Sequence, residues 1–144
     1  MRVSTRGRYA LRAMIDVALH SNEGPVLRQG IAERQAISAD YVAQLFSDLR
    51  RAGLVEGVRG PGGGYRLARD PAAITAGDVI SAVEGPVAVV SCALPSDDPV
   101  CSRIDHCVTH SLWKRLSESI TQVLDSVTLE EMREEARQLG EGHH

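Results

Sequence analysis

The chain has 144 residues, of which 43% are hydrophobic and 24% are charged, a composition that is typical of one folded domain and excludes a large multidomain enzyme or a disordered chain. Its formal net charge of −3 is the sum of two unlike halves. Residues 1–70 hold 11 Arg against 7 Asp or Glu, a net charge of +4, whereas residues 71–144 carry a net charge of −7, so the first half is a candidate for binding a polyanion.

Three helices are predicted in the basic half. The first has apolar residues at helical spacing on one face, namely Leu11, Met14, Ile15, Ala18 and Leu19. Ser4 or Thr5 is available as its N-cap. A short second helix is expected over residues 27–35, and Ser38 is a good N-cap for a third helix that ends at Gly53. The inward face of this third helix is Val42, Leu45, Phe46 and Leu49.

The hydrophobic pattern then changes to that of a hairpin. Residues 54–58 and 65–69 are two predicted strands, and residues 59–64 join them through a glycine-rich tip. Three helices followed by a hairpin are the order of a winged helix-turn-helix, so residues 1–84 are predicted to be a DNA-binding domain of this kind. We therefore expect a mainly α fold with one small β-hairpin, and double-stranded DNA as a partner.

The acidic half is expected to hold a sensor loop and a dimer helix. A short helix is predicted around residues 77–84, a cysteine-containing loop over 85–107, and a long helix with an acidic tail over 108–139. One side of the long helix is apolar, at Val108, Leu112, Leu116, Ile120, Val123, Leu124 and Val127. Because so small a globule has little to cover this stripe, we expect a homodimer, with a core within one chain as the alternative.

The predicted DNA contacts lie on the chain start, the third helix and the hairpin tip. They are Arg8, Ser38, Tyr41, Gln44, Arg50, Arg59, Gly60, Pro61, Gly62 and Gly63, with Arg6 and Arg51 as further phosphate contacts. Gln44 is suited to adenine in the major groove, and Arg59 to a narrow minor groove. A solvated helix face and a simple turn are the alternatives. No Lys-Ser or Lys-Thr follows the glycines, which excludes a nucleotide phosphate loop.

The only three cysteines lie within sixteen residues of one another. Cys92, Cys101 and Cys107, with His110, have the donor set of a zinc site or an iron–sulfur cluster. The scarcity of basic residues among them argues against an RNA-binding finger, and three unligated thiols remain an alternative, as does His106 as a ligand. With no signal peptide or membrane span predicted, we expect a cytoplasmic protein with no membrane partner.

Three stretches carry a resemblance to a known family. Residues 7–14 (GRYALRAM), 37–46 (ISADYVAQLF) and 58–65 (VRGPGGGY) resemble the bacterial iron–sulfur winged-helix regulators, the group of IscR, NsrR and RirA. The resemblance implies a homodimeric transcription factor, usually a repressor, whose operator affinity changes with cluster occupancy or redox state. It assigns the cluster to the three cysteines, with His110 as the fourth ligand of the IscR pattern.

The resemblance favours a 2Fe-2S cluster, with 4Fe-4S as an alternative. Two positions depart from the IscR pattern: eight residues separate Cys92 from Cys101, more than the usual five, and Ala43 stands where Glu is common. Two other functions remain open, a zinc-stabilised DNA-binding regulator without redox sensing and a thiol redox or electron-transfer protein. No catalytic constellation stands out, so we do not expect an enzyme.

Overall fold

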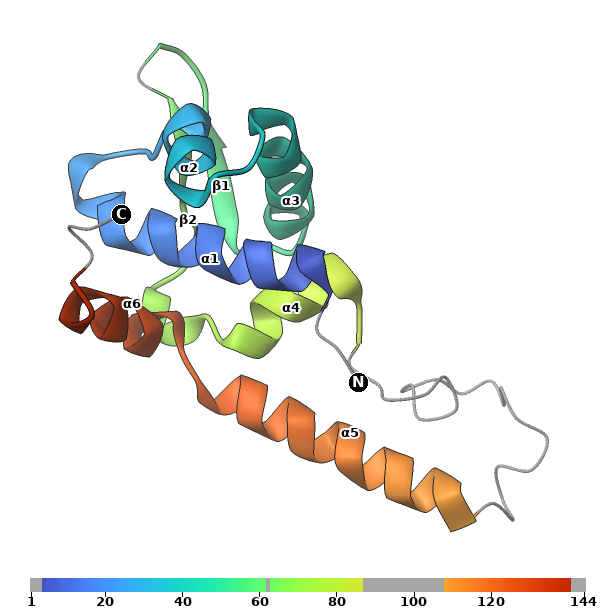
Figure 1. The fold of residues 1–144 in the computed structure, drawn as a ribbon. Helices are drawn as coiled ribbons and strands as arrows, with labels where there is room; N and C mark the ends of the chain where they lie inside the picture. Colours follow the sequence, from blue (N-terminus) through green and yellow to red (C-terminus); the bar gives the residue numbers. More distant parts are fainter. Residues whose placement is uncertain (1–3, 62, 87–107, 141–144) are drawn as a thin grey trace.

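The computed structural model describes residues 4–61, 63–86 and 108–140. Within these residues it has six α-helices and one antiparallel hairpin (Figure 1). In chain order they are α1 (Thr5–His20), α2 (Arg28–Gln35), α3 (Ala39–Arg51), β1 (Val55–Val58), β2 (Gly64–Leu67), α4 (Ala76–Glu84), α5 (Val108–Ser126) and α6 (Leu129–Gln138). The predicted mainly α class, with its single hairpin, is confirmed.

Side-chain caps begin four of these helices. Ser4 Oγ accepts a hydrogen bond from the backbone N–H of Gly7 at 3.3 Å, and Ser38 Oγ accepts one from Tyr41 at 3.0 Å. Thr75 forms a reciprocal capping box at the start of α4, and Thr128 caps α6. Because a capping oxygen satisfies amides that have no partner inside the helix, these short polar residues determine where each helix starts. Of the two predicted caps for α1, Ser4 or Thr5, the structure has Ser4, and the predicted Ser38 cap is confirmed.

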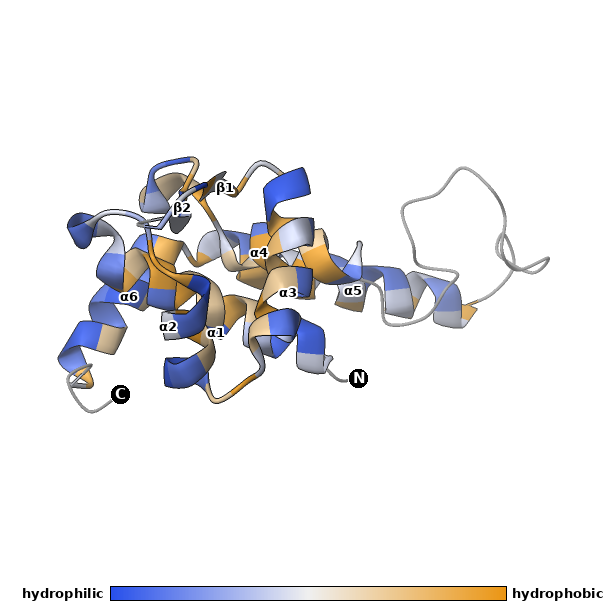
Figure 2. Ribbon diagram, turned by 90° about the horizontal axis from the view of Figure 1, so that it is seen from above, coloured by the Kyte–Doolittle hydropathy of each residue, from blue (hydrophilic) through white to orange (hydrophobic). Residues whose placement is uncertain are grey.

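The core surrounds α1, which lies between α2 and α3 on one side and α4 and α6 on the other (Figure 1). Hydrophobic residues gather where α1, α3 and α4 meet (Figure 2). The predicted inward face of α1 is partly wrong, because Leu11, Ile15 and Leu19 are only half-buried. The fully buried face is Ala10, Ala13, Met14, Val17 and Ala18. Its alanines allow helices on both sides to approach closely, which a pattern weighted toward large side chains underestimates.

The hairpin is tied to both neighbouring helices. Its register pairs Val55 with Leu67 and Val58 with Gly64. Beyond the ladder, Val26 and Tyr65 exchange two backbone hydrogen bonds of 2.8 Å. The Tyr65 ring also stacks on Phe46 of α3, with 4.3 Å between ring centroids. The hairpin is therefore held beside the start of α2 and the middle of α3.

The C-terminal helices have opposite environments. α5 runs out beyond the other helices (Figures 1 and 2), and its apolar stripe is open, with Val108 87%, Leu112 53% and Val123 63% exposed. α6 returns to α1, and Leu129 is fully buried in the core. The first turn of the predicted acidic tail is thus a core element. None of the helices in the described ranges is long and apolar enough to cross a membrane.

Candidate nucleic-acid interface

The third helix presents two of the predicted DNA contacts with different degrees of exposure. Gln44 is exposed on α3, on the side opposite the buried Leu45 and Leu49. Tyr41 is half-buried, because its ring packs edge-on against Tyr9 with 6.1 Å between centroids. Gln44 is therefore free to meet a base edge, whereas Tyr41 is held in one orientation by α1.

Glycines shape the hairpin tip. Gly60 has φ +103°, a conformation that a side chain rarely adopts. A Cβ on Gly63 would lie 2.1 Å from the carbonyl oxygen of Val58, so only glycine fits there. Arg59, Gly60 and Pro61 are exposed, while the predicted contact Gly62 lies outside the described residues. The tip thus offers bare backbone beside a cationic side chain, an arrangement suited to close approach to a nucleic-acid backbone.

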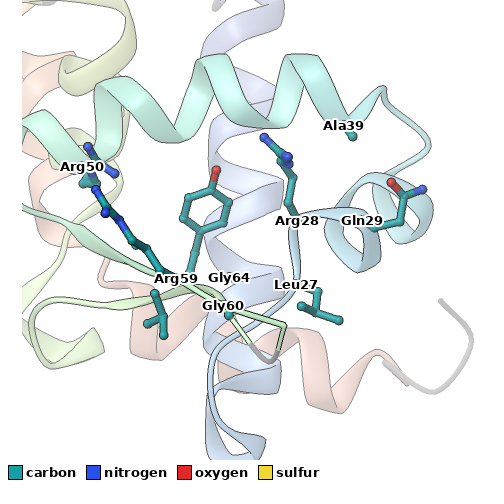
Figure 3. Close-up of a pocket in the computed structure, with 12 residues that line it drawn as sticks. Leu27, Arg28, Gln29, Ala39, Arg50, Arg59, Gly60 and Gly64 are labelled. Atoms are coloured by element: carbon teal, nitrogen blue, oxygen red, sulfur yellow. The ribbon is translucent and has the colours of Figure 1, made fainter.

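A groove of about 490 Å³ lies between the hairpin, the start of α2 and α3 (Figure 3). We call it the arginine groove, because three arginines line it, Arg28, Arg50 and Arg59. No acidic residue is among its described lining residues, which also include Leu27, Gln29, Ala39, Gly57, Val58, Gly60, Gly63, Gly64 and Tyr65. The groove brings Arg50 of α3 together with the predicted hairpin contacts Arg59, Gly60 and Gly63, whereas the other predicted contacts of α3, Ser38, Tyr41 and Gln44, do not line it. Its electrostatics favour an anion.

Arg28 was missed in the sequence analysis. It is the first residue of α2, whose first turn contains no acidic residue. A cation at a helix N-terminus opposes the helix dipole, at a cost of about 0.3–1 kcal/mol. This unfavourable placement was the signal that could have marked Arg28 as functional. It could be used only with an accurate helix boundary, and the sequence predicted that the helix starts at residue 27, one position before Arg28.

Of three predicted phosphate contacts from the chain start and the end of α3, one is bonded within the protein and two are exposed. Arg6 pairs with Asp48 of α3, and its Nε also donates to the carbonyl oxygen of Val83 at 3.5 Å. In this structure the Arg6 guanidinium joins α1 to α3 and α4, and its role as a phosphate contact stays a prediction. Arg51 is exposed and lies 3.4 Å from the same carboxylate. Arg8 is exposed on α1 and does not line the arginine groove.

A buried carboxylate holds α2 against α1. Asp16 is 2% exposed, and its two oxygens accept hydrogen bonds from Arg34 at 2.7 and 2.9 Å and from the Gln35 amide at 3.0 Å. These hydrogen bonds to Asp16 raise the pKa of Arg34 above its ordinary value. Gln35 also accepts from Arg12 Nε at 3.0 Å. The network fixes the helix that precedes α3, so it positions the predicted recognition helix through α2.

The predicted metal ligands are divided by the limits of the described residues. Cys92, Cys101 and Cys107 lie outside them. His110 lies in the first turn of α5, and its Nδ1 is buried with no hydrogen-bond partner among the described residues. A buried imidazole nitrogen without a partner is costly unless another group satisfies it. His110 therefore has the property expected of a ligand to a metal held with the neighbouring segment.

Comparisons with known proteins agree on one family. A model of the Rrf2 family, described as iron-dependent transcriptional regulators, matches residues 3–135. The chain is 53% identical over 132 residues to the HTH-type transcriptional regulator IscR of Xenorhabdus nematophila, which covers 92% of this chain and 79% of the relative. The IscR of Vibrio cholerae is 52% identical over the same length, 75% of that relative.

Solved structures give the same result. The structure of T. potens IscR matches with a TM-score of 0.77 and 44% identity, covering 97% of this chain and 91% of that one. CymR of B. subtilis, a global cysteine regulator, matches with a TM-score of 0.74 and 41% identity, over 93% and 97% of the two chains. At these identities this chain resembles the two regulators in sequence as well as in fold.

Proposed function

Because this chain belongs to the Rrf2 family of iron-dependent transcriptional regulators, we propose that it is a repressor whose affinity for its operator depends on a bound iron–sulfur cluster. It is a DNA-binding regulator and not an enzyme, and its named relatives are transcriptional regulators as well. We further propose that it acts as a homodimer in the cytoplasm, where its DNA lies.

One observation supports DNA binding above the others. The exposed face of α3 and the glycine tip of the hairpin flank the arginine groove, which has no acidic residue among its described lining. Gln44 is proposed to read a base edge in the major groove, and Arg59 to enter the adjacent minor groove. Ser38, Tyr41, Gly60, Pro61, Gly62 and Gly63, with Arg8 and Arg50, are proposed as backbone or base contacts.

The proposed cluster ligands are Cys92, Cys101, Cys107 and His110. Three thiolates and one imidazole suit an iron–sulfur centre, and the partnerless buried Nδ1 of His110 supports its inclusion. A bound cluster supplies a redox-active and iron-dependent group. We favour 2Fe-2S, the type that the IscR resemblance implies, over 4Fe-4S. A cluster held by the three cysteines and His110 would join α5 to the loop before it, so loss of the cluster would free that loop.

The proposed dimer uses the apolar stripe of α5. Four large hydrophobic residues are exposed on this helix: Val108, Leu112, Leu116 and Val123. An exposed apolar stripe of this kind marks an interaction site, where a partner removes it from water. A second copy of α5 is such a partner, since two-fold pairing brings like stripes together. Pairing would also provide two α3 helices for the two halves of an operator.

The test is a visible absorption spectrum of protein purified without oxygen, combined with iron, sulfide and zinc analysis. We expect coloured protein with stoichiometric iron and sulfide, colourless Cys101→Ala, and a Ser102→Ala control that keeps the colour. Operator affinity, measured by fluorescence anisotropy, should change when the cluster is removed. Colourless parent protein that holds zinc would instead support a metal-stabilised regulator without redox sensing.

A further inference from the structure

The arginine groove lies between the two elements proposed to enter DNA. In duplex DNA one sugar–phosphate strand separates the major groove from the adjacent minor groove, so a protein that inserts α3 into one and the hairpin into the other must cross this strand between them. We propose that the arginine groove seats this strand and that Arg28, the arginine contributed by α2, is one of its phosphate ligands. This inference rests on the proposed DNA-binding function.

The position of Arg28 is set by its neighbours. Val26, two residues earlier, exchanges two backbone hydrogen bonds of 2.8 Å with Tyr65 of the hairpin. The start of α2 is thereby held against β2, and a Cβ at Gly64 would lie only 2.2 Å from the Val26 carbonyl oxygen. Arg28 therefore projects into the groove from a backbone that is fixed on the hairpin side (Figure 3).

Arg28 also differs from the arginines that have structural roles. Arg6 pairs with Asp48, Arg34 with Asp16 and Arg66 with Glu56. Arg28 is exposed, and no ion pair or hydrogen bond of its guanidinium is found among the described residues. Since the groove's described lining contains no carboxylate, three like charges face one space, and an anion that enters it relieves their repulsion.

A phosphate is the anion that this arrangement suits. A guanidinium presents planar donors that match two phosphate oxygens, and backbone contacts of this type add affinity without sequence preference. Each phosphate neutralised adds about 0.9 to the slope of log affinity against log salt concentration. The two Arg28 contacts in a bound dimer therefore contribute about 1.8 to this slope. Between 50 and 200 mM salt, the parent should lose about 12-fold more affinity than a variant that lacks both contacts.

The experiment measures operator affinity from 50 to 200 mM salt for three variants of the full chain. Arg28→Ala should reduce the slope by about 1.8 and weaken operator and unrelated DNA by similar factors. Arg28→Lys keeps the charge and should keep the slope. Arg66→Ala is the matched control, because Arg66 and its partner Glu56 are hairpin residues that do not line the groove, and its slope should equal the parent's.

The outcomes separate the two proposals. Parent protein that binds DNA, with Arg28→Ala of unchanged slope, would overturn the role of Arg28 and leave the regulator function standing. Parent protein without salt-dependent DNA binding would remove the proposed function and this inference with it. A slope change with an unchanged melting temperature supports a phosphate contact. If Arg28→Ala lowers the melting temperature and Arg28→Lys does not restore affinity, Arg28 has a structural role instead.

Discussion

Replacing Asp16 by Asn should destabilise the domain more than any exposed charge change. Asp16 is 2% exposed and accepts hydrogen bonds from two nitrogens of Arg34 and from the Gln35 amide. Asn keeps the shape but removes the negative charge, and its amide group directs a donor toward the Arg34 guanidinium. A positive charge at a half-buried position then loses its counter-charge.

The magnitude follows from burial. Removing one partner of a buried ion pair costs about 3–5 kcal/mol. Because Arg34 is 28% exposed, water recovers part of its solvation, and we expect a loss of about 2–3 kcal/mol in the free energy of unfolding. For a chain of this length that loss lowers the melting temperature by about 4–12 °C.

The assay is urea unfolding followed by circular dichroism, at one protein concentration because a dimer's stability depends on it. The denaturation midpoint should fall without a change in the slope of the transition. Glu56→Gln, which breaks the exposed pair of Glu56 with Arg66, should cost under about 1 kcal/mol. If Asp16→Asn costs no more than this control, the reasoning that ties α2 to α1 through a buried charge is refuted.

The pH dependence provides a second check on the same pair. The hydrogen bonds that Arg34 donates to Asp16 raise the pKa of Arg34 in the folded state. The stability that this shift contributes is therefore complete below the ordinary arginine pKa and is lost only as pH rises through the higher folded value. The stability difference between parent and Arg34→Gln should therefore be constant from about pH 6 to 9. A difference that shrinks within that range contradicts a charged Arg34 at neutral pH.

Three further changes test other parts of the molecule. Gly64→Ala places a Cβ 2.2 Å from a backbone carbonyl oxygen and should cost about 2 kcal/mol or more, whereas Gly57→Ala meets only a flexible arginine and should cost less, as thermal melts would reveal. Leu112→Glu on the open stripe of α5 should give monomers by sedimentation, while Thr121→Glu on the same helix should not; dimeric Leu112→Glu would refute the α5 interface. Ala43→Glu should narrow the range of operators bound, and equal selectivity in parent and variant would contradict a role for this position.

Local chemistry made much of the fold predictable. Ser4 and Ser38 were recognisable as caps, and the glycine-rich tip between two strand-like segments was recognisable as a hairpin, because each feature depends on residues close together in the chain. The exposed residues of α3, among them the proposed DNA contact Gln44, followed from its apolar period. These features depend on few residues, so one sequence is enough to detect them.

What the sequence could not reveal depends on partners distant in the chain. Asp16 meets Arg34, and Val26 meets Tyr65, only after the helices pack, so neither the buried carboxylate nor the position of Arg28 follows from periodicity. The alanine-rich face of α1 was likewise underestimated, because small residues mark close helix contact only when the neighbouring helix is known. The use of Arg6 in an ion pair has the same origin.

The chain between residues 76 and 127 begins and ends at a single point, and its first part, α4, packs in the core. The backbone N–H of Ala76 donates to the carbonyl oxygen of Val127 at 2.8 Å, and that of Leu129 donates to Ile74 at 2.7 Å. In topological terms the part of the chain that follows α4 is anchored at both ends, by α4 packed on α1 and by the hydrogen bonds at Val127 and Leu129, so its length can change without moving either anchor. Since doubling a flexible connection costs only about 0.6 kcal/mol in closure entropy, evolution can lengthen the spacing between Cys92 and Cys101, or exchange the proposed sensor segment after α4 for another, without redesigning the DNA-binding half.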